Sequence, residues 1–165
     1  MAHPKIGNMA PAFSLQDQNG DSISLKDFKG KKHVVLYFYP KAKTPGCSVQ
    51  ACGVRDSYAE FEARNTVVLG VSPDPVAKLK KFEELPKKDS PAPLNFPLLS
   101  DEDHAIADKY GAWGPKKFMG REFDGILRST FIIGSDGRLK AIMDPVKTKT
   151  HDADVLALLD ELQLS

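Results

Sequence analysis

Cysteine, net charge and long apolar runs are all scarce in this sequence of 165 residues. The presence of only two cysteines excludes a disulfide-rich scaffold, and a chain of this length can bury a sufficient hydrophobic core without disulfide bonds. The 23 basic and 22 acidic side chains nearly cancel, so we expect no general attraction to nucleic acid or to an anionic membrane surface. No apolar run approaches the roughly 20 residues that a helix needs to cross a bilayer, so we expect no membrane-spanning helix.

The N-terminal residues 1–7 are polar and lack the apolar segment of a signal peptide, so we expect a cytoplasmic protein. Cytosolic reducing systems keep ordinary thiols reduced. Two closely spaced cysteines in that compartment therefore indicate catalysis or metal binding rather than a structural disulfide. Because the chain has no repeat, low-complexity tract or dividing linker, residues 1–165 are expected to form a single domain.

Hydrophobic patterning alternates between strand-like and helical segments, which is typical of an α/β fold. Strands are predicted at residues 12–15, 22–25, 34–39, 66–72, 96–100, 129–134 and 139–143, and helices at residues 47–64, 74–85, 103–110 and 152–164. Asn19-Gly20 between the first two strands predicts a hairpin, and the continuous apolar runs of the next two strands predict the centre of a sheet. Residues 86–94 are too rich in proline and charge to form an element, and their role stays open.

The most informative local feature is a cysteine at the junction of a strand and a helix. Cys47 directly follows a Thr-Pro-Gly turn, and Cys52 follows five residues later. A thiol in the first turn of a helix lies beside unpaired backbone N–H groups and the positive end of the helix dipole, which favour its thiolate. Reactivity is therefore the first hypothesis for Cys47. The alternative is packing, because a free cysteine is also a small buried hydrophobe.

The segments around this junction resemble a known family signature. They are Phe38-Tyr39-Pro40, Thr44-Pro45-Gly46-Cys47, Ala51-Cys52 and Arg55-Asp56, with further matches at residues 96–101 and 125–131. The chain resembles the peroxiredoxins over essentially its whole length, specifically the bacterioferritin-comigratory-protein or PrxQ subfamily. The resemblance implies a thioredoxin-like α/β fold in which helices flank a central mixed β-sheet, with an N-terminal β-hairpin extension. It also implies thiol-dependent reduction of hydrogen peroxide and organic hydroperoxides.

The resemblance implies a peroxide site formed by Pro40, Thr44, Cys47 and Arg128. Cys47 would attack the peroxide and become a sulfenic acid. Thr44 would direct its hydroxyl toward the sulfur or the peroxide, and Arg128 would supply positive charge to the sulfur anion and the departing oxygen. Pro40 is rigid and lacks an N–H group, which suits a wall that shields the thiolate from water.

Cys52 is the expected resolving cysteine of an atypical two-cysteine mechanism. In some relatives the resolving cysteine lies on the helix that precedes residues 86–94, but here that helix holds no cysteine. Five residues along a helix separate two α-carbons by roughly 8.7 Å, whereas a disulfide usually requires them within about 7 Å. The first turns of the helix must therefore unwind before Cys47 and Cys52 can bond. Thioredoxin, or alternatively glutaredoxin, is the expected reductant, and the resemblance favours a monomer.

Two departures from the subfamily pattern lie in the same helix, where Ser48 and Gln50 replace the more usual threonine and glutamate. No metal or other cofactor is expected, because the four histidines are scattered and two cysteines five residues apart do not complete a zinc site. Two alternative functions stay open. One is a general thiol-disulfide oxidoreductase, which normally has cysteines two residues apart. The other is a non-enzymatic redox sensor or binding module that uses the same disulfide.

Overall fold

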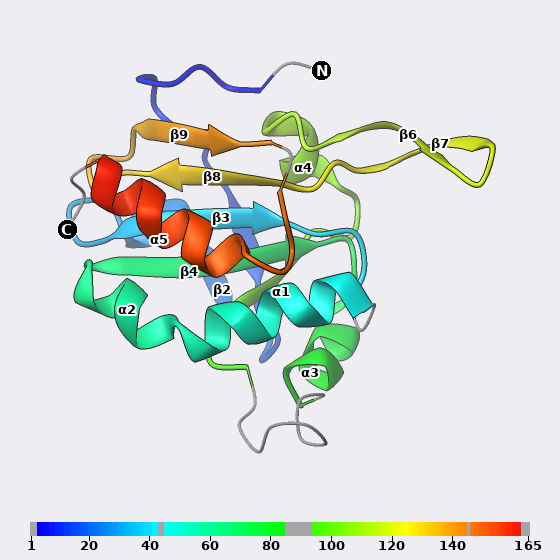
Figure 1. The fold of residues 1–165 in the computed structure, drawn as a ribbon, viewed down its shortest axis with the longest axis horizontal. Coiled ribbons are helices and arrows are strands. Elements are labelled where there is room, and N and C mark those ends of the chain that lie inside the picture. Colours follow the sequence, from blue (N-terminus) through cyan, green and yellow to red (C-terminus); the bar gives the residue numbers. More distant parts are fainter. Residues whose placement is uncertain (1–2, 43–44, 85–93, 145, 163–165) are drawn as a thin grey trace.

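A seven-stranded mixed β-sheet forms the centre of the computed structural model, which describes residues 3–42, 45–84, 94–144 and 146–162 (Figure 1). In spatial order its strands are β2 (Ser22–Ser24), β1 (Ser14–Gln16), β5 (Leu98–Ser100), β4 (Thr66–Ser72), β3 (His33–Phe38), β8 (Ser129–Ile133) and β9 (Leu139–Met143). The three middle strands β5, β4 and β3 are parallel to one another. The remaining pairs, β2 with β1, β1 with β5, β3 with β8 and β8 with β9, are antiparallel.

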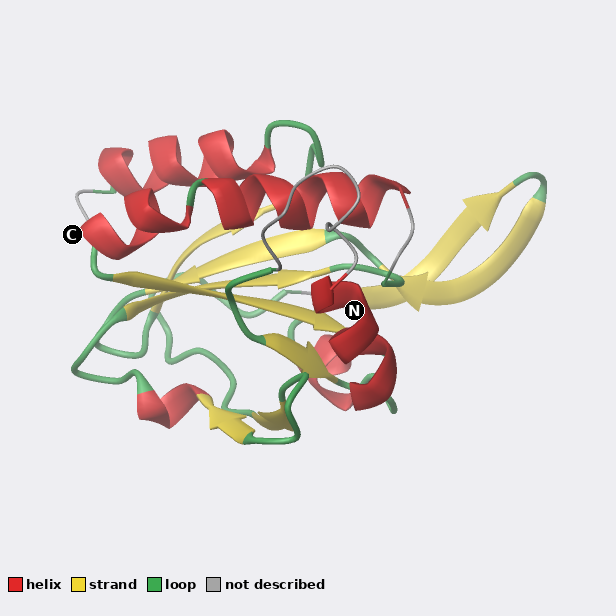
Figure 2. Cartoon of the chain, turned by 90° about the horizontal axis from the view of Figure 1, so that it is seen from below, coloured by secondary structure: helices red, strands yellow, loops and turns green. Residues whose placement is uncertain are grey.

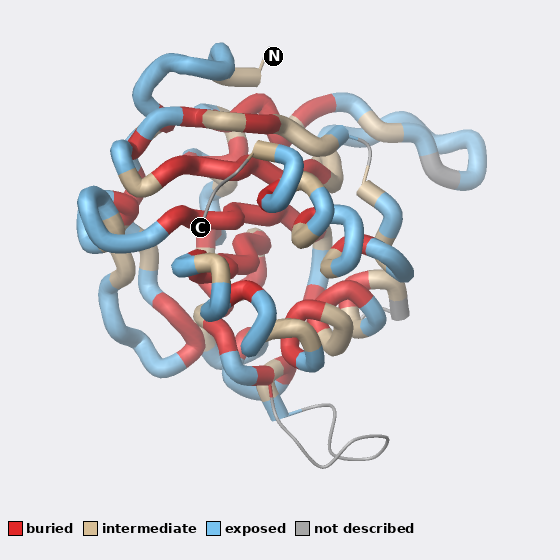
Figure 3. The backbone as a smooth tube through the Cα atoms, turned by 60° about the vertical axis from the view of Figure 1, so that its left-hand side comes forward, coloured by how far each residue is buried: buried red, intermediate tan, exposed pale blue. Residues whose placement is uncertain are grey.

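The central strands β3, β4 and β8 are buried along their whole length (Figure 3). The sequences of β3 and β4 are mainly continuous rather than alternating apolar runs, as expected for strands that are covered on both faces. In the parallel pair, Leu36 of β3 lies opposite Leu69 of β4. From the end of β3 in this pair, the chain continues into the first long helix.

Helices cover both faces of the sheet unequally (Figure 2). They are η1 (Leu25–Asp27), α1 (Pro45–Asp56), α2 (Tyr58–Ala63), α3 (Val76–Glu84), α4 (Ala105–Lys109) and α5 (His151–Glu161). One apolar cluster packs α1, α2, α3 and α5 on one face, and a second packs η1, α4 and the N-terminal segment on the other. None of the helices in the described ranges is long and apolar enough to cross a membrane.

A two-stranded hairpin, which the sequence patterning did not predict, projects from the body of the molecule (Figure 1). Its strands are β6 (Trp113–Phe118) and β7 (Arg121–Ile126). Both residues of its connecting turn, Met119 and Gly120, have positive φ angles, which suit the tight turn of a two-residue hairpin. The strands are largely exposed and charged, so the apolar alternation that reveals a half-buried strand is absent.

The other predicted elements are found with small shifts in their ends. The N-terminal hairpin is confirmed, with Leu15 opposite Ile23, and the strand predicted at residues 66–72 has the same ends as β4. The single helix predicted at residues 47–64 is wrong in one respect, because it is two helices separated at Ser57. The predicted loop at residues 86–94 lies outside the described residues except for Leu94.

Candidate active site

Three elements meet where the predicted reactive cysteine lies. Strand β3 ends at Phe38, which pairs with Ser129 at the start of β8, so Pro40 and Arg128 flank the same edge of the sheet. Helix α1 begins at this edge and carries Cys47 in its first turn, where the residue is only 1% exposed. Pro40 is partly exposed, and the predicted Thr44 lies outside the described residues.

Arg128 binds the sulfur of Cys47 directly. Its Nη2 donates to the Cys47 Sγ over 3.3 Å, and its Nη1 donates to the Gln50 Oε1 over 2.6 Å. The same planar guanidinium therefore contacts two side chains that lie one turn apart on α1. Of the four predicted peroxide-site residues, the described structure brings Cys47 and Arg128 together. This contact places the positively charged guanidinium of Arg128 beside the Cys47 sulfur. A cation in this position favours the thiolate form of a cysteine.

The backbone of Ala42, which follows β3, is held by a buried carboxylate. Asp74 is 6% exposed, and its Oδ2 accepts hydrogen bonds from the Ala42 backbone N–H at 2.7 Å and from the Ser72 hydroxyl at 2.8 Å. Ser72 ends β4, so Asp74 ties the approach to Cys47 to the central sheet. The local sequence indicates only that Asp74 begins a helix, because its contact with Ala42 joins residues 32 positions apart.

A buried polar chain continues behind Arg128. The Gln50 Nε2 lies 3.2 Å from the His151 Nδ1, and the His151 Nε2 lies 2.8 Å from the Thr130 Oγ1. Gln50 and His151 are each 1% exposed. Burial lowers the pKa of His151 to about 4. The nearby Asp152 and Asp154 carboxylates oppose this shift in pKa, and Arg128 adds a smaller effect in the same direction as burial. His151 therefore stays neutral at ordinary pH.

In the sequence, His151 is one of four scattered histidines, and its position alone indicates no role. The contact that matters joins residues 101 positions apart, and nothing in the local sequence reports it. Gln50 was noticed only as a departure from the family pattern. That departure was the available signal, since a neutral amide beside an arginine needs a further partner for its NH₂ group.

The hairpin and the sheet also contribute charged and aromatic groups near the site. Partial burial lowers the pKa of Lys116 on β6, with Arg128 acting in the same direction and Cys47 opposing it. Tyr37 of β3 is buried, and its pKa is raised well above the ordinary value by burial. Its hydroxyl has no hydrogen-bond partner within the described ranges. Cys47 itself packs in the apolar cluster below α1, and Arg128 donates a hydrogen bond to its sulfur.

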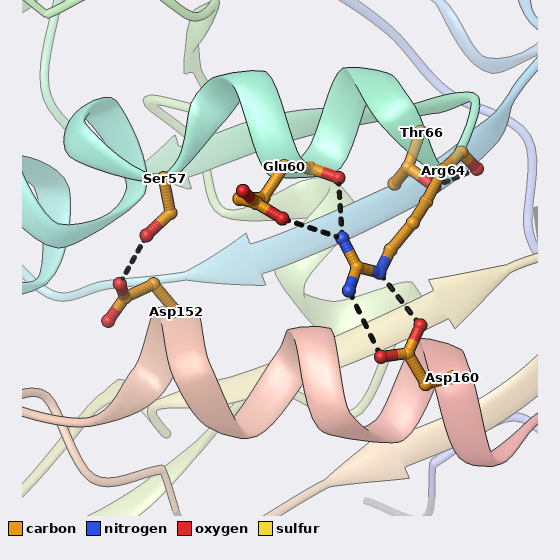
Figure 4. A network of polar contacts seen from close by, with 6 residues as sticks. All are labelled: Ser57, Glu60, Arg64, Thr66, Asp152 and Asp160. Atoms are coloured by element: carbon orange, nitrogen blue, oxygen red, sulfur yellow. Dashed lines mark hydrogen bonds and ion pairs between the residues drawn. The ribbon is translucent and has the colours of Figure 1, made fainter.

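Both cysteines lie on one continuous helix and are free. Helix geometry places their α-carbons roughly 8.7 Å apart, beyond the reach of about 7 Å that a disulfide usually requires. Cys47 is buried and Cys52 is partly exposed. Further along, the Ser57 hydroxyl donates to Asp152, and Arg64 binds Asp160, so this helical segment is tied to α5 (Figure 4).

The described residues contain no group of three or more histidine, cysteine, aspartate or glutamate side chains arranged to hold a metal ion. The chemistry that the described geometry supports is that of a thiol beside a guanidinium.

Comparison with known proteins gives consistent matches. The model of the AhpC/TSA family matches residues 6–142. The putative peroxiredoxin bcp of Haemophilus influenzae is 50% identical over 157 residues, covering 95% of this chain and 97% of that protein. Peroxiredoxin Bcp of Escherichia coli is 48% identical over 157 residues, covering 95% and 96% respectively. The crystal structure of a cysteine-to-serine mutant of PrxQ from Xylella fastidiosa has a TM-score of 0.86 and 31% identity over 98% of both chains.

Proposed function

The chain belongs to the AhpC/TSA family and, within it, to the peroxiredoxins of the Bcp/PrxQ type, and from this premise we propose that Cys47 is the thiol that reduces hydroperoxides. The mixed sheet flanked by helices is the thioredoxin-like fold of its solved relatives, as the sequence predicted. The observation that carries the assignment is the 3.3 Å contact between the Arg128 Nη2 and the Cys47 Sγ.

In the first step, the Cys47 thiolate attacks one oxygen of the hydroperoxide and the O–O bond breaks. Cys47 becomes a sulfenic acid, and the other oxygen leaves as hydroxide or alkoxide and takes up a proton. Arg128 stabilises the sulfur anion and then the negative charge on the departing oxygen. We assign Thr44 to orienting the peroxide and Pro40 to shielding the thiolate from water, as the family resemblance implies.

In the second step, the Cys52 thiol attacks the sulfenic sulfur, a disulfide forms and water leaves. The N-terminal turns of α1 have to open for this step, because the intact helix holds the two cysteines too far apart. A thioredoxin dithiol then reduces the disulfide by exchange, with glutaredoxin as the other candidate reductant. Since both cysteines lie on one chain, a monomer suffices, and we place the cycle in the reducing cytoplasm.

The experiment that tests this function is a peroxidase assay on cysteine variants, with hydrogen peroxide and an alkyl hydroperoxide as substrates and thioredoxin as reductant. Cys47→Ser is expected to abolish turnover. Cys52→Ser should still be oxidised once by peroxide but should not be recycled by thioredoxin. Full turnover in Cys47→Ser would reject the assignment of the attacking thiol.

Stopped-flow measurement of peroxide oxidation separates this enzyme from the two alternatives. A peroxidase should react with peroxide much faster than a free thiol does. Slow, thiol-like oxidation would instead favour a redox sensor or binding module. Fast reduction of protein disulfides without peroxide consumption would favour a general thiol-disulfide oxidoreductase.

A further inference from the structure

The Gln50 side-chain amide can face Arg128 in only one of its two orientations. The guanidinium carries only hydrogen-bond donors, so the Gln50 atom that faces Nη1 at 2.6 Å has to be the amide oxygen. The Gln50 amide nitrogen therefore points away from Arg128 and toward His151. An amide turned the other way would place an NH₂ group against the guanidinium, two donors facing each other.

The same donor and acceptor rules fix the state of His151. The Gln50 Nε2 only donates, so the His151 Nδ1 that it meets at 3.2 Å has to be an acceptor without a proton. A neutral ring then carries its proton on Nε2, which donates to the Thr130 Oγ1 at 2.8 Å. The ring is held in place by the edge-on contact with Tyr37, at a centroid distance of 5.2 Å.

We propose that His151 is a positioning residue for Cys47 chemistry: its Nδ1 orients the Gln50 amide, and the amide oxygen holds the Arg128 guanidinium on the sulfur. This proposal rests on the proposed function of Cys47. It gives the buried chain Thr130–His151–Gln50–Arg128 a role in the site, and it explains how an amide replaces the more usual glutamate at position 50. A carboxylate has two equivalent acceptor oxygens and needs no partner to choose its orientation.

Substitution of His151 tests the proposal by rescue. His151→Leu removes the acceptor, and the rate of Cys47 oxidation by hydrogen peroxide is expected to fall by on the order of 10- to 100-fold, since small errors of placement have effects of this size. His151→Asn can present its Oδ1 close to the position of Nδ1 and should recover most of that loss. His33→Asn is the matched control, because His33 is also buried and accepts an N–H at its Nδ1, from Ser135. This variant should react like the wild type.

A second comparison separates positioning from a general packing defect. In the Gln50→Glu background, Arg128 has a carboxylate partner that needs no orientation, so adding His151→Leu should slow Cys47 oxidation by less than about threefold, a non-additive result. An equal loss in both backgrounds would overturn the proposal, and so would an unchanged rate in His151→Leu alone.

The tautomer of His151 can be measured in the wild-type protein by the nitrogen chemical shifts of its ring. A neutral ring protonated on Nε2 is expected, and a proton on Nδ1 would overturn the proposal whether or not the variants fold. If the wild type fails to reduce peroxide, the proposed function fails by itself. The rate at which iodoacetamide alkylates Cys47, followed by mass spectrometry, then replaces peroxide as the readout in the same set of variants.

Discussion

At the scale of single residues, Arg128 acts through two nitrogens of one rigid plane. One nitrogen meets the Cys47 sulfur and the other meets the Gln50 oxygen. Lysine would keep the positive charge but has one nitrogen on a flexible stem, so it cannot hold both partners in this geometry. Charge alone is therefore not expected to replace Arg128.

We expect Arg128→Lys to lower the second-order rate constant of Cys47 oxidation by hydrogen peroxide by roughly 10²-fold, the size of effect seen when an oriented donor is lost. Stopped-flow fluorescence or competition with a second peroxidase measures this rate. Arg121→Lys, on the exposed strand β7, is the control that should leave the rate unchanged. Equal rates for both variants would show that orientation of the charge is unimportant.

Asp74 anchors the Ala42 backbone to the end of β4. Asp74→Ala would leave the buried Ala42 N–H and the Ser72 hydroxyl without their acceptor, which should lower the free energy of unfolding by about 1–3 kcal/mol. Asp74→Asn is the matched control, since it keeps one acceptor oxygen and should lose less. Denaturant unfolding measures both, and equal stabilities of the alanine variant and the wild type would contradict the anchoring role.

At the scale of elements, the proposed cycle requires the first turns of α1 to unwind while α2 remains helical. The first turns of α1 have to unwind to join the cysteines, and Gly53 lowers the helix propensity there by about 1 kcal/mol relative to alanine. Beyond it, Ser57 binds Asp152 and Arg64 binds Asp160, which hold the following segment on α5 (Figure 4). The boundary of unwinding is therefore expected near Ser57.

Hydrogen exchange of the disulfide form tests this division. Amide exchange should speed up over residues 46–55 on oxidation and should stay slow in α2, and helix content should fall. Cys52→Ser, which cannot form the intramolecular disulfide, is the control that should show no such change. Unchanged exchange over residues 46–55 in a verified disulfide form would refute the unwinding step.

The same elements show which local structure the sequence can predict. β4 was predicted to the residue because its apolar run is only seven residues long and rich in β-branched valine, which is typical of a buried strand rather than a helix. The β6–β7 hairpin was missed because its strands are exposed and charged, and because its turn uses Met119-Gly120 rather than an Asn-Gly pair. The break at Ser57 was missed because it accompanies a contact with α5, a helix that lies about a hundred residues later.

At the scale of the whole molecule, the site residues that the sequence could predict are those that belong to a local sequence motif. Cys47 and Arg128 belong to recognisable segments, and the sheet brings these segments together through the pairing of Phe38 with Ser129. The contact between Gln50 and His151 depends instead on the packing of α5 against α1. Such a contact is a product of tertiary structure, so residue type and spacing along the chain could not reveal it.

Burial of neutral His151 also links the packing of the whole molecule to pH. The unfolded chain takes up a proton at this residue near pH 6.5, whereas the folded protein resists protonation until the pKa of about 4. Between these values the unfolded state binds more protons, so the free energy of unfolding falls as the pH falls. Full stability from this residue is present above pH 6.5, and about 3 kcal/mol is lost by pH 4.

The measurement is denaturant unfolding of the wild type and of His151→Asn at a series of pH values from neutral to pH 4. An asparagine side chain does not titrate, so the variant should lose less stability on acidification than the wild type. Asp136 and Asp160 have lowered pKa values and also weaken the fold in acid, but both are present in the two proteins and their effects cancel in the difference. If the difference in stability between the two proteins does not change with pH, then burial does not lower the pKa of His151 and this prediction is wrong.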